Sequence, residues 1–564
     1  MAVTSANTAS PVLVHPQPFD FGMLARSLTR YTMRQLAYRL VRPARRWRGR
    51  RVVRLGALRM PERPIGLALP VPTTQLEARG IRVLGQLVDW DALQGSDLHF
   101  LTRLQAYHLA YLDWLCDPTF DVDLGERAMR WWTLRGSRCP GAWDPYPVAC
   151  RVLSIVAAWP SLSRERRRVL LPLLTVLAEH VCILAFGIEF DLGGNHLIRT
   201  ATALALGASL FESTVARQWL QRGLEIVASE APAQVGGDGG HLERSPLYHA
   251  LVLSDLWTLR ALAQSRHGSG HLFVESLNPL VERMGAWLEA VVSMPGGVPV
   301  WGDSHIDVPE LWDSLVQVGL SPNGDPGPRR EVTLPETGIY GTVAGPFAVR
   351  ANFGWPLMKQ CPAHAHADLL EVELAYKGAL LISDSGVPEY EAGPERTFYR
   401  STRAHPTVEV DGRSQHELWG SFRMGRSGQV HDVKLSTARS WTRLEGWHDG
   451  YEFLPGSPRH SRTVTLTPDQ GTVEVSDEVT GRGIHEVALR WQLEPGVSLS
   501  MLSENCVAIA CNTGTAHLVG SGRWEVEAGS RAPRLGTRLD RPVIVTRHRG
   551  PLPARLMTRI KGGP

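Results

Sequence analysis

Two histidines on alternate positions precede an apolar alternating run in the stretch CPAHAHADLLEVELAYKGALLISDSG, residues 361–386. They are His364 and His366, and the run ends on Asp384. Because strand side chains two residues apart point to the same face, the two imidazoles would lie side by side. With Asp384 and the later His405 of STRAHPT, they form a set of imidazoles and a carboxylate that suits a divalent metal, with zinc the usual occupant. A proton-transfer site and a hydrogen-bonded cluster without metal are the alternatives.

A second polar stretch, DLGGNHLIR at 191–199, opens an expected helix. Asn195 or His196 would lie near the N-terminus of that helix, where backbone N–H groups and the helix dipole favour anionic groups. The alternative is that Asn195 only caps the helix.

A third stretch, GGDGGHLERSPLYH at 236–249, is a glycine-rich loop that carries His241, Glu243 and Arg244. Tyr248 follows at the start of the next expected helix. A tyrosine within a cationic loop can have a lowered pKa and serve in proton transfer. The alternative is a capping loop in which the tyrosine ring is simply packed.

The hydrophobic period changes partway along the chain, from helical spacing to alternation. Between about 85 and 330, apolar residues recur every three or four positions, as in 164–187, 195–211, 214–231, 248–265 and 278–294. From about 335 the period is two, and turn residues separate the runs. We therefore predict an α+β chain, with an N-terminal helical toroid or bundle and a C-terminal antiparallel β-sandwich. The expected boundaries are a lead-in at 1–84, the helical domain at 85–330 and the sandwich at 331–564.

The segment 21–60 contains twelve arginines and no acid. It predicts a basic, imperfectly amphipathic helix that could lie peripherally on an anionic membrane surface or on another protein. The alternative is a helix that packs on its own domain and leaves its arginine face in solvent. The N-terminus has no signal-peptide pattern and no window reads as a membrane span, which favours a cytoplasmic or membrane-peripheral location over the periplasm.

The bulk composition narrows the class of protein. A chain of 564 residues is too long for one compact core, so two or three domains are expected. A formal net charge of +4 is small for this length and argues for no nucleic-acid partner. The seven cysteines are scattered without a CxxC pair, so they suggest neither a zinc knuckle nor a disulfide framework.

Two other classes of protein share parts of this pattern. An amidohydrolase also uses His-x-His with a later His and Asp, but its motif lies early and leads into alternating strands and helices, whereas here only strands follow. A non-catalytic sugar-binding or scaffold protein would fit tryptophan-rich strands. Such a protein would not need a set of His, Tyr and Arg residues spread over two domains.

Four segments follow one another in a specific order: NHLIRTATALALGASLF, DGGHLERSPLYH, HAHADLLEVELAYKGALLISDSG and FYRSTRAHPTVEVDGRSQHELWGSFRMGR. Over roughly residues 100–560 the chain resembles the heparinase II/III-like polysaccharide lyases, of the type found beside bacterial exopolysaccharide synthesis systems. The resemblance implies an (α/α) toroid followed by a β-sandwich, in agreement with the change of period. It also implies a carbon–oxygen lyase that cleaves an acidic, uronic-acid-containing glycosaminoglycan, alginate or exopolysaccharide by β-elimination. A non-catalytic polysaccharide-binding or assembly factor is the alternative.

The resemblance further implies roles for individual residues. Asn195 would neutralise the uronate carboxylate, with His196 as the alternative register. Tyr248 would transfer the proton, and His364 would be the second proton or charge partner. The candidate substrate-binding residues are His196, Arg199, His241, Glu243 and Arg244.

The resemblance also implies one structural divalent metal, zinc by its ligand types, held by His366, Asp384 and His405. Pro406 stands where the family commonly has Asn, so the loop beside His405 departs from the family pattern.

Overall fold

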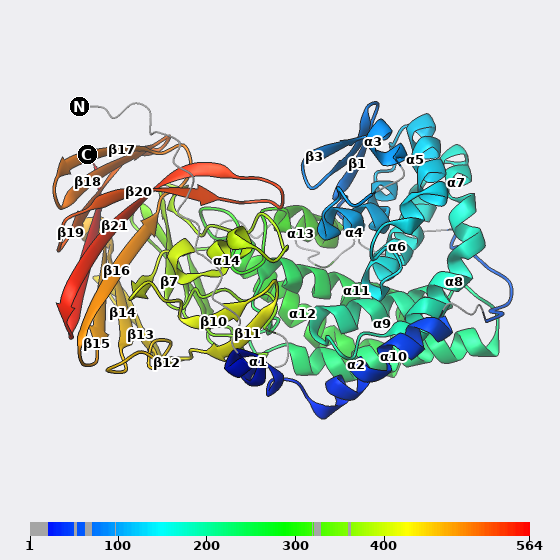
Figure 1. The fold of residues 1–564 in the computed structure, drawn as a ribbon, viewed down its shortest axis with the longest axis horizontal. Helices are drawn as coiled ribbons and strands as arrows, with labels where there is room; N and C mark the ends of the chain where they lie inside the picture. Colours follow the sequence, from blue (N-terminus) through cyan, green and yellow to red (C-terminus); the bar gives the residue numbers. More distant parts are fainter. Residues whose placement is uncertain are drawn as a thin grey trace.

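The computed structural model describes residues 21–49, 53–62, 70–95, 98–317, 320, 329–358 and 362–563. A helical part and a sheet-rich part lie side by side along the longest axis of the molecule (Figure 1). A small antiparallel sheet precedes the main helices, where the sequence predicted only a lead-in. It consists of β1 (Thr74–Glu77), β2 (Gly80–Val83) and β3 (Gln86–Asp89), followed by α3 (Trp90–Gln94).

The helical part confirms the toroid predicted from the three- and four-residue spacing. Its helices are α4 (Arg103–Tyr111), α5 (Val122–Leu134), α6 (Pro145–Ala158), α7 (Arg164–Val169), α8 (Leu171–Gly187), α9 (Gly194–Ala208), α10 (Thr214–Gln234), α11 (Pro246–His267), α12 (Leu272–Val292) and α13 (Val308–Gln317). The predicted helix at 164–187 is divided in two before Leu171, where Pro172 fits the first turn of a new helix. In the described part of the chain, no helix is both long and apolar enough to cross a bilayer.

The sheet-rich part confirms the predicted antiparallel sandwich. One sheet has five strands in the order β4 (Glu331–Leu334), β5 (Ile339–Ala344), β6 (Phe347–Asn352), β7 (Glu371–Tyr376) and β8 (Ala379–Ile382). A larger sheet has the order β12 (Val430–Ala438), β13 (Trp441–His448), β14 (Arg459–Thr467), β15 (Thr472–Thr480), β22 (Ala554–Gly562), β19 (Gly514–Gly520), β18 (Cys506–Cys511) and β17 (Ser498–Ser503). A third has the order β20 (Glu525–Arg531), β21 (Leu539–Pro551), β16 (Ile484–Gln492) and β9 (Val408–Val410).

Two short elements of the sheet-rich part approach the helical part. One is the hairpin of β10 (His416–Trp419) and β11 (Arg423–Ser427), and the other is the helix α14 (Pro394–Arg400). Both lie in the segment that joins the first strands to the large sheet, and both contribute side chains to the boundary between the two parts.

The basic N-terminal segment forms two helices instead of the single predicted helix. They are α1 (Phe21–Leu28) and α2 (Met33–Gly49). Helix α1 packs against β11 of the sheet-rich part, whereas α2 packs against α8 of the helical part. The chain breaks between them because its two ends bind different domains. We call residues 21–49 the N-terminal strap (Figure 1).

Helix α9 lies at the centre of the helical part and carries Asn195 in its first turn. It packs against α6, α8, α10 and α11. Its small side chains allow the neighbouring helices to approach closely. Two of them, Ala201 and Ala205, are fully buried. A Cβ added to Gly223 of α10 would stand 2.7 Å from the Ala201 carbonyl oxygen and 2.8 Å from the Ala205 Cβ. The start of α9 is therefore fixed by packing against its neighbours.

Replacing Gly223 with alanine should push α10 away from α9 and cost about 1–3 kcal/mol of stability through overpacking. We expect a lower midpoint of thermal unfolding, measured by circular dichroism. Gly270→Ala is the matched control, since an added Cβ there meets no atom within 4 Å. Equal unfolding midpoints for the two variants would contradict the tight contact.

Candidate functional site

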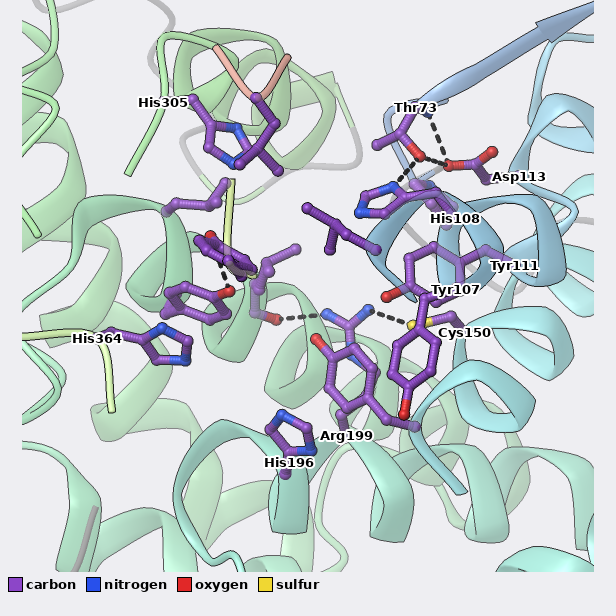
Figure 2. A pocket seen from close by; sticks show the side chains of 18 of the residues that line it. Thr73, Tyr107, His108, Tyr111, Asp113, Cys150, His196, Arg199, His305 and His364 are labelled. Carbon is purple, nitrogen blue, oxygen red and sulfur yellow. Dashed lines mark hydrogen bonds between the residues drawn. The ribbon is translucent and has the colours of Figure 1, made fainter. Parts of the chain in front are cut away.

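A cavity of about 920 Å³ lies where the helical part meets the sheet-rich part (Figure 2). Its wall contains residues of α4, α6, α9 and α11 on one side and of the loops 362–364, 390–391 and 421–423 on the other. Small-molecule sites commonly have volumes of roughly 300–1,000 Å³. Tyrosine, histidine and arginine side chains are prominent in the wall, and they can stack on sugar rings and bind anionic groups. The cavity is the candidate binding site.

Three residues predicted from separate motifs meet at one wall of this cavity. The rings of Tyr248 and His364 are stacked, with centroids 3.5 Å apart and planes inclined by 17°. The side-chain Nδ2 of Asn195 lies 3.3 Å from Nε2 of His364. Tyr248 and His364 line the cavity, whereas Asn195 is 2% exposed and lies behind His364. The structure thus brings the three candidate catalytic residues into one contact group.

The carboxylate of Asp303 sets the orientation of His364. Asp303 is fully buried, and its Oδ2 lies 2.9 Å from Nδ1 of His364. Arg396 donates to both oxygens of Asp303, at 2.5 and 2.8 Å. Burial would raise the pKa of Asp303, but the charge of Arg396 and the hydrogen bonds to the carboxylate outweigh burial and hold this pKa well below its usual range. An ionised carboxylate only accepts, so Nδ1 of His364 carries a proton. The other ring nitrogen, Nε2, lies 3.3 Å from Asn195 Nδ2 and 3.6 Å from Oε2 of Glu243.

Tyr248 keeps its proton in this environment. Burial, followed by the neighbouring Tyr390, raises the pKa of Tyr248 well above its usual value. The hydroxyl oxygens of the two tyrosines are 3.2 Å apart. The predicted lowering of the Tyr248 pKa by a cationic loop is therefore wrong, because the ring packs against His364 and Tyr390 instead of the loop arginine. A phenol of this kind suits the donation of a proton.

The carboxylate of Glu243 holds Asn195 in place through two hydrogen bonds. Its Oε1 accepts from the Asn195 backbone N–H at 2.9 Å, and its Oε2 accepts from Asn195 Nδ2 at 2.8 Å. Burial would raise the pKa of Glu243, but His364, His241 and the Asn195 hydrogen bonds outweigh burial and lower it. Glu243 is 4% exposed and lies outside the cavity wall, so it positions the Asn195 amide instead of facing a ligand.

His196 and Arg199 line the cavity, as a role in binding requires (Figure 2). Nδ1 of His196 lies 2.9 Å from Oε2 of Glu189, and its ring lies 4.3 Å from that of Tyr146. Arg199 donates from Nε to Oδ2 of Asp255 at 2.8 Å. Burial alone would lower the pKa of Arg199, but the charge of Asp255 outweighs burial and raises it, so the guanidinium stays charged.

His241 and Arg244, which were predicted to bind substrate, lie away from the cavity wall. Arg244 donates to the Thr337 carbonyl oxygen at 2.9 Å and also to the side chain of Asn352. His241 is buried, with its Nε2 3.3 Å from Oε1 of Gln234. Arg244 thus connects the glycine-rich loop to the sheet-rich part, whereas His241 bonds within the helical part.

The predicted metal ligands lie in a fully buried cluster that also contains Glu371. Single ligand atoms of Glu371, Asp384 and His405 lie within 4.8 Å of one another. The ring of His366 is 5.4 Å from that of His405, and its Nε2 lies 3.0 Å from Oδ1 of Asp303. Among the described residues, His366 Nδ1, His405 Nε2 and both Glu371 oxygens have no hydrogen-bond partner. Because unpartnered buried acceptors are rare, this donor set fits a divalent cation, with Glu371 added to the predicted ligands.

Sequence reasoning missed Asp303, Tyr390, Arg396 and Glu371. The hydrogen-bond partners of Asp303 are 61, 63 and 93 residues away, so no local spacing marks it. Glu371 did leave a signal, because an acid on a strand whose side chains are buried on both faces needs a partner.

Comparisons with known proteins agree with this architecture. Residues 105–317 match the family described as heparinase II/III N-terminus, and residues 326–553 match the family described as heparinase II/III-like, C-terminal. The N-terminal strap lies outside both matched ranges.

Three curated relatives show moderate identity. A heparin-sulfate lyase of Pedobacter heparinus is 25% identical over 326 residues, which cover 53% of this chain and 46% of that protein. A heparin-sulfate lyase of Bacteroides stercoris is 26% identical over 422 residues, or 68% of this chain and 59% of that protein. FtsZ-localized protein C of Caulobacter vibrioides is 24% identical over 396 residues, or 67% and 66% of the two chains. The chain thus spans between 46% and 66% of the length of these relatives.

Solved structures share the fold. Heparinase III superposes with a TM-score of 0.65 at 16% identity, covering 85% of this chain and 80% of that chain. A heparan sulfate lyase from Pedobacter heparinus superposes with a TM-score of 0.56 at 18% identity, covering 94% and 88%. With its helical toroid, its antiparallel sandwich and both matched ranges, the chain belongs to the heparinase II/III-like family.

Proposed function

We propose that this protein is a polysaccharide lyase that cleaves an acidic, uronic-acid-containing polymer by β-elimination. The observation that carries the proposal is the stack of Tyr248 on His364 at the cavity wall, with the His364 ring oriented by Asp303. Family membership and the heparin-sulfate lyase relatives support this class of substrate.

In the proposed reaction, His364 is the base and Tyr248 is the acid. The C5–H of the uronate faces Nε2 of His364, and this nitrogen takes the proton. The electron pair of the C5–H bond forms the C4–C5 double bond as the C4–O4 bond breaks. Tyr248 gives its proton to the departing oxygen, so one product ends in a 4,5-unsaturated uronate and the other gains a hydroxyl. In this reaction His364 must take the proton as the neutral ring, and the raised pKa of Tyr248 suits a proton donor.

Asn195 is the proposed partner of the substrate carboxylate. The C5 proton is poorly acidic while the neighbouring carboxylate carries its full charge, so this charge must be stabilised as the enolate-like state forms. The carboxyl carbon is bonded to C5, so a C5–H aimed at His364 Nε2 brings the carboxylate beside the Asn195 amide, 3.3 Å from that nitrogen. His196, which faces the cavity, is the alternative partner.

Replacing Tyr248 with phenylalanine removes the proposed acid and keeps the ring stack. We expect the elimination rate to fall about 100-fold or more, the usual size of a general acid contribution. The measurement is the rise in ultraviolet absorbance from the unsaturated uronate, with heparan sulfate, alginate, hyaluronan and the host's own exopolysaccharide as substrates.

Tyr107→Phe is the matched control, because Tyr107 also lines the cavity but lies apart from His364 (Figure 2). This variant should keep most of the wild-type rate. An undiminished rate in Tyr248→Phe would exclude the proposed acid. A wild-type protein that binds these polymers and cleaves none would favour the alternative, a non-catalytic binding or assembly factor in bacterial exopolysaccharide production.

We also propose a structural divalent metal, zinc by its ligand types, held by His366, Asp384, His405 and Glu371. When bound, it would neutralise the two buried carboxylates and cross-link the strand end at Glu371 to the loops around it. The unpartnered nitrogens and oxygens of this cluster support the proposal. His366 would also connect the metal to Asp303, and through Asp303 to His364.

For the metal, elemental analysis should find about one divalent ion per wild-type chain and a large loss in His366→Ala. Chelation should lower the wild-type unfolding temperature, since a ligand bound only to the folded state stabilises it. His249→Ala is the control, because His249 is equally buried but bonds to the Met284 carbonyl oxygen outside the cluster. A wild-type protein that is folded, active and metal-free would end this proposal.

We further propose that α2 makes peripheral contact with an anionic membrane. Its outward face exposes Met33 by 81%, Leu40 by 82% and Trp47 by 59%. Apolar and aromatic side chains on one face of an arginine-rich helix are typical of helices that lie in the bilayer interface. The segment carries no acid that would repel anionic lipid.

The triple variant Met33→Ser, Leu40→Ser, Trp47→Ser should lose binding to vesicles that contain phosphatidylserine, because the inserted apolar surface is removed. Co-sedimentation measures this binding. The control variant Leu272→Ser, Ile484→Ser changes two side chains that are 80% and 75% exposed elsewhere, and it should bind like the wild type. Unchanged sedimentation of the triple variant would refute the membrane contact.

A further inference from the structure

The N-terminal strap joins the two domains beside the cavity. On the sheet-rich side, Ser27 Oγ donates to the Met424 carbonyl oxygen at 3.1 Å and accepts from Trp419 Nε1 at 2.9 Å. Arg30 Nε donates to the Gly425 carbonyl oxygen at 2.8 Å, so α1 is tied to the β10–β11 hairpin by buried and half-buried polar contacts.

On the helical side, α2 is held by the loop that precedes α9. Arg42 donates to Oδ2 of Asp191 at 2.9 Å and to Oε1 of Glu189 at 3.4 Å. The guanidinium of Arg34 lies 4.4 Å from the ring centre of Phe190. Arg45 Nε donates to the Phe186 carbonyl oxygen at 3.0 Å. These contacts fix the second end of the strap on the toroid.

Between these two attachments the chain passes along the cavity. Tyr31, Arg39 and Arg42 of the strap are part of the cavity wall, together with His196 and His364. A covalent chain that is anchored on both domains and also lines the cavity between them forms part of the cavity wall on that side.

Arg39 differs from its neighbour Arg42 in how far its charge is neutralised. Arg42 makes hydrogen bonds to two acids, whereas the one ion pair of Arg39 within the described part of the chain is with Asp191, at 4.0 Å. The Arg39 guanidinium lies over the ring of Tyr31 at 4.7 Å, and its side chain is 41% exposed. Stacking fixes the plane of the guanidinium and leaves its edges available to an anionic group.

We propose that the strap is the end wall of the substrate cavity and that Arg39 binds the acidic group of the chain-terminal sugar. The enzyme would then remove short products from a chain end instead of cutting within the polymer. This inference rests on the proposed lyase function. It assigns a role to a segment outside both ranges that match the family.

Product size tests the end wall. With a polymer that the wild type cleaves, size-exclusion chromatography of early products should show only short unsaturated fragments beside nearly full-length polymer. The variant Arg26→Ala, Ser27→Ala, Arg30→Ala removes side-chain contacts between α1 and the hairpin, and it should release intermediate-length fragments from the start. Intermediate lengths from the wild type, or identical products from both proteins, would overturn the end wall.

Binding tests Arg39 separately from catalysis. Calorimetry with hexasaccharides of heparan sulfate, alginate and hyaluronan should show about 10-fold weaker binding for Arg39→Ala, the size of one charge-assisted hydrogen bond. Arg59→Ala is the control, because Arg59 pairs with Glu212 away from the cavity wall. Equal affinity for Arg39→Ala and wild type, or no binding by the wild type, would overturn this role.

Together, the binding and product-size measurements distinguish a failure of the strap inference from a failure of the proposed lyase function. Binding that depends on Arg39, with no cleavage of any polymer, would overturn the lyase function and keep the subsite. Cleavage with no change of affinity or product size in the strap variants would overturn the strap inference and keep the lyase.

Discussion

The carboxylate of Asp303 is the interaction on which the rest of the site depends. It is fully buried, and it contacts His364, His366 and the charged Arg396 at 2.5–3.0 Å. Asp303 comes from a loop of the helical part, whereas its three partners come from the sheet-rich part. A buried charge is tolerated only when it is paired and hydrogen-bonded, so this carboxylate requires the two domains to be docked. The proposed proton-transfer residue His364 and the candidate metal ligand His366 therefore share one contact with Asp303.

The surroundings of Tyr248 and His364 would separate the proposed acid from the proposed base. The anionic Asp303 accepts a hydrogen bond from Nδ1 of His364, so this nitrogen carries a proton and Nε2 is the nitrogen left for the proposed base role. Tyr248 is buried against aromatic rings, and burial raises its pKa well above the usual value, so it keeps its proton. The two rings, whose centroids are 3.5 Å apart, thus differ in their link to Asp303: His364 makes a hydrogen bond to the carboxylate, whereas the charge of the carboxylate helps to raise the pKa of Tyr248.

The sequence predicted the parts of this site that depend on local pattern. The change from helical to alternating period located the two domains, because each period reflects which side chains a helix or strand buries. The motifs located Asn195, Tyr248 and His364, which do meet in space. The surroundings of each residue could not be predicted from the local sequence pattern, because they depend on residues far away in the chain. The pKa of Tyr248 depends on Tyr390, 142 residues away, and the expected cation Arg244 turns out to bind Thr337, 93 residues away.

The N-terminal strap shows why a periodic pattern cannot by itself orient a helix. The spacing of apolar and basic residues identifies two faces, and the usual expectation places the apolar face inward. Here Glu189 and Asp191 are nearly buried acids at the toroid surface, and they need cations. Arg42 contacts both acids, so the side of α2 with Arg42 and Arg45 turns inward and the stripe with Met33 and Leu40 turns outward, while Arg34 and Arg39 stay exposed. This orientation of α2 also places Arg39 in the cavity wall. Pairing with Glu189 and Asp191 therefore accounts for two features of α2: the arginines at the cavity wall and the exposed apolar stripe.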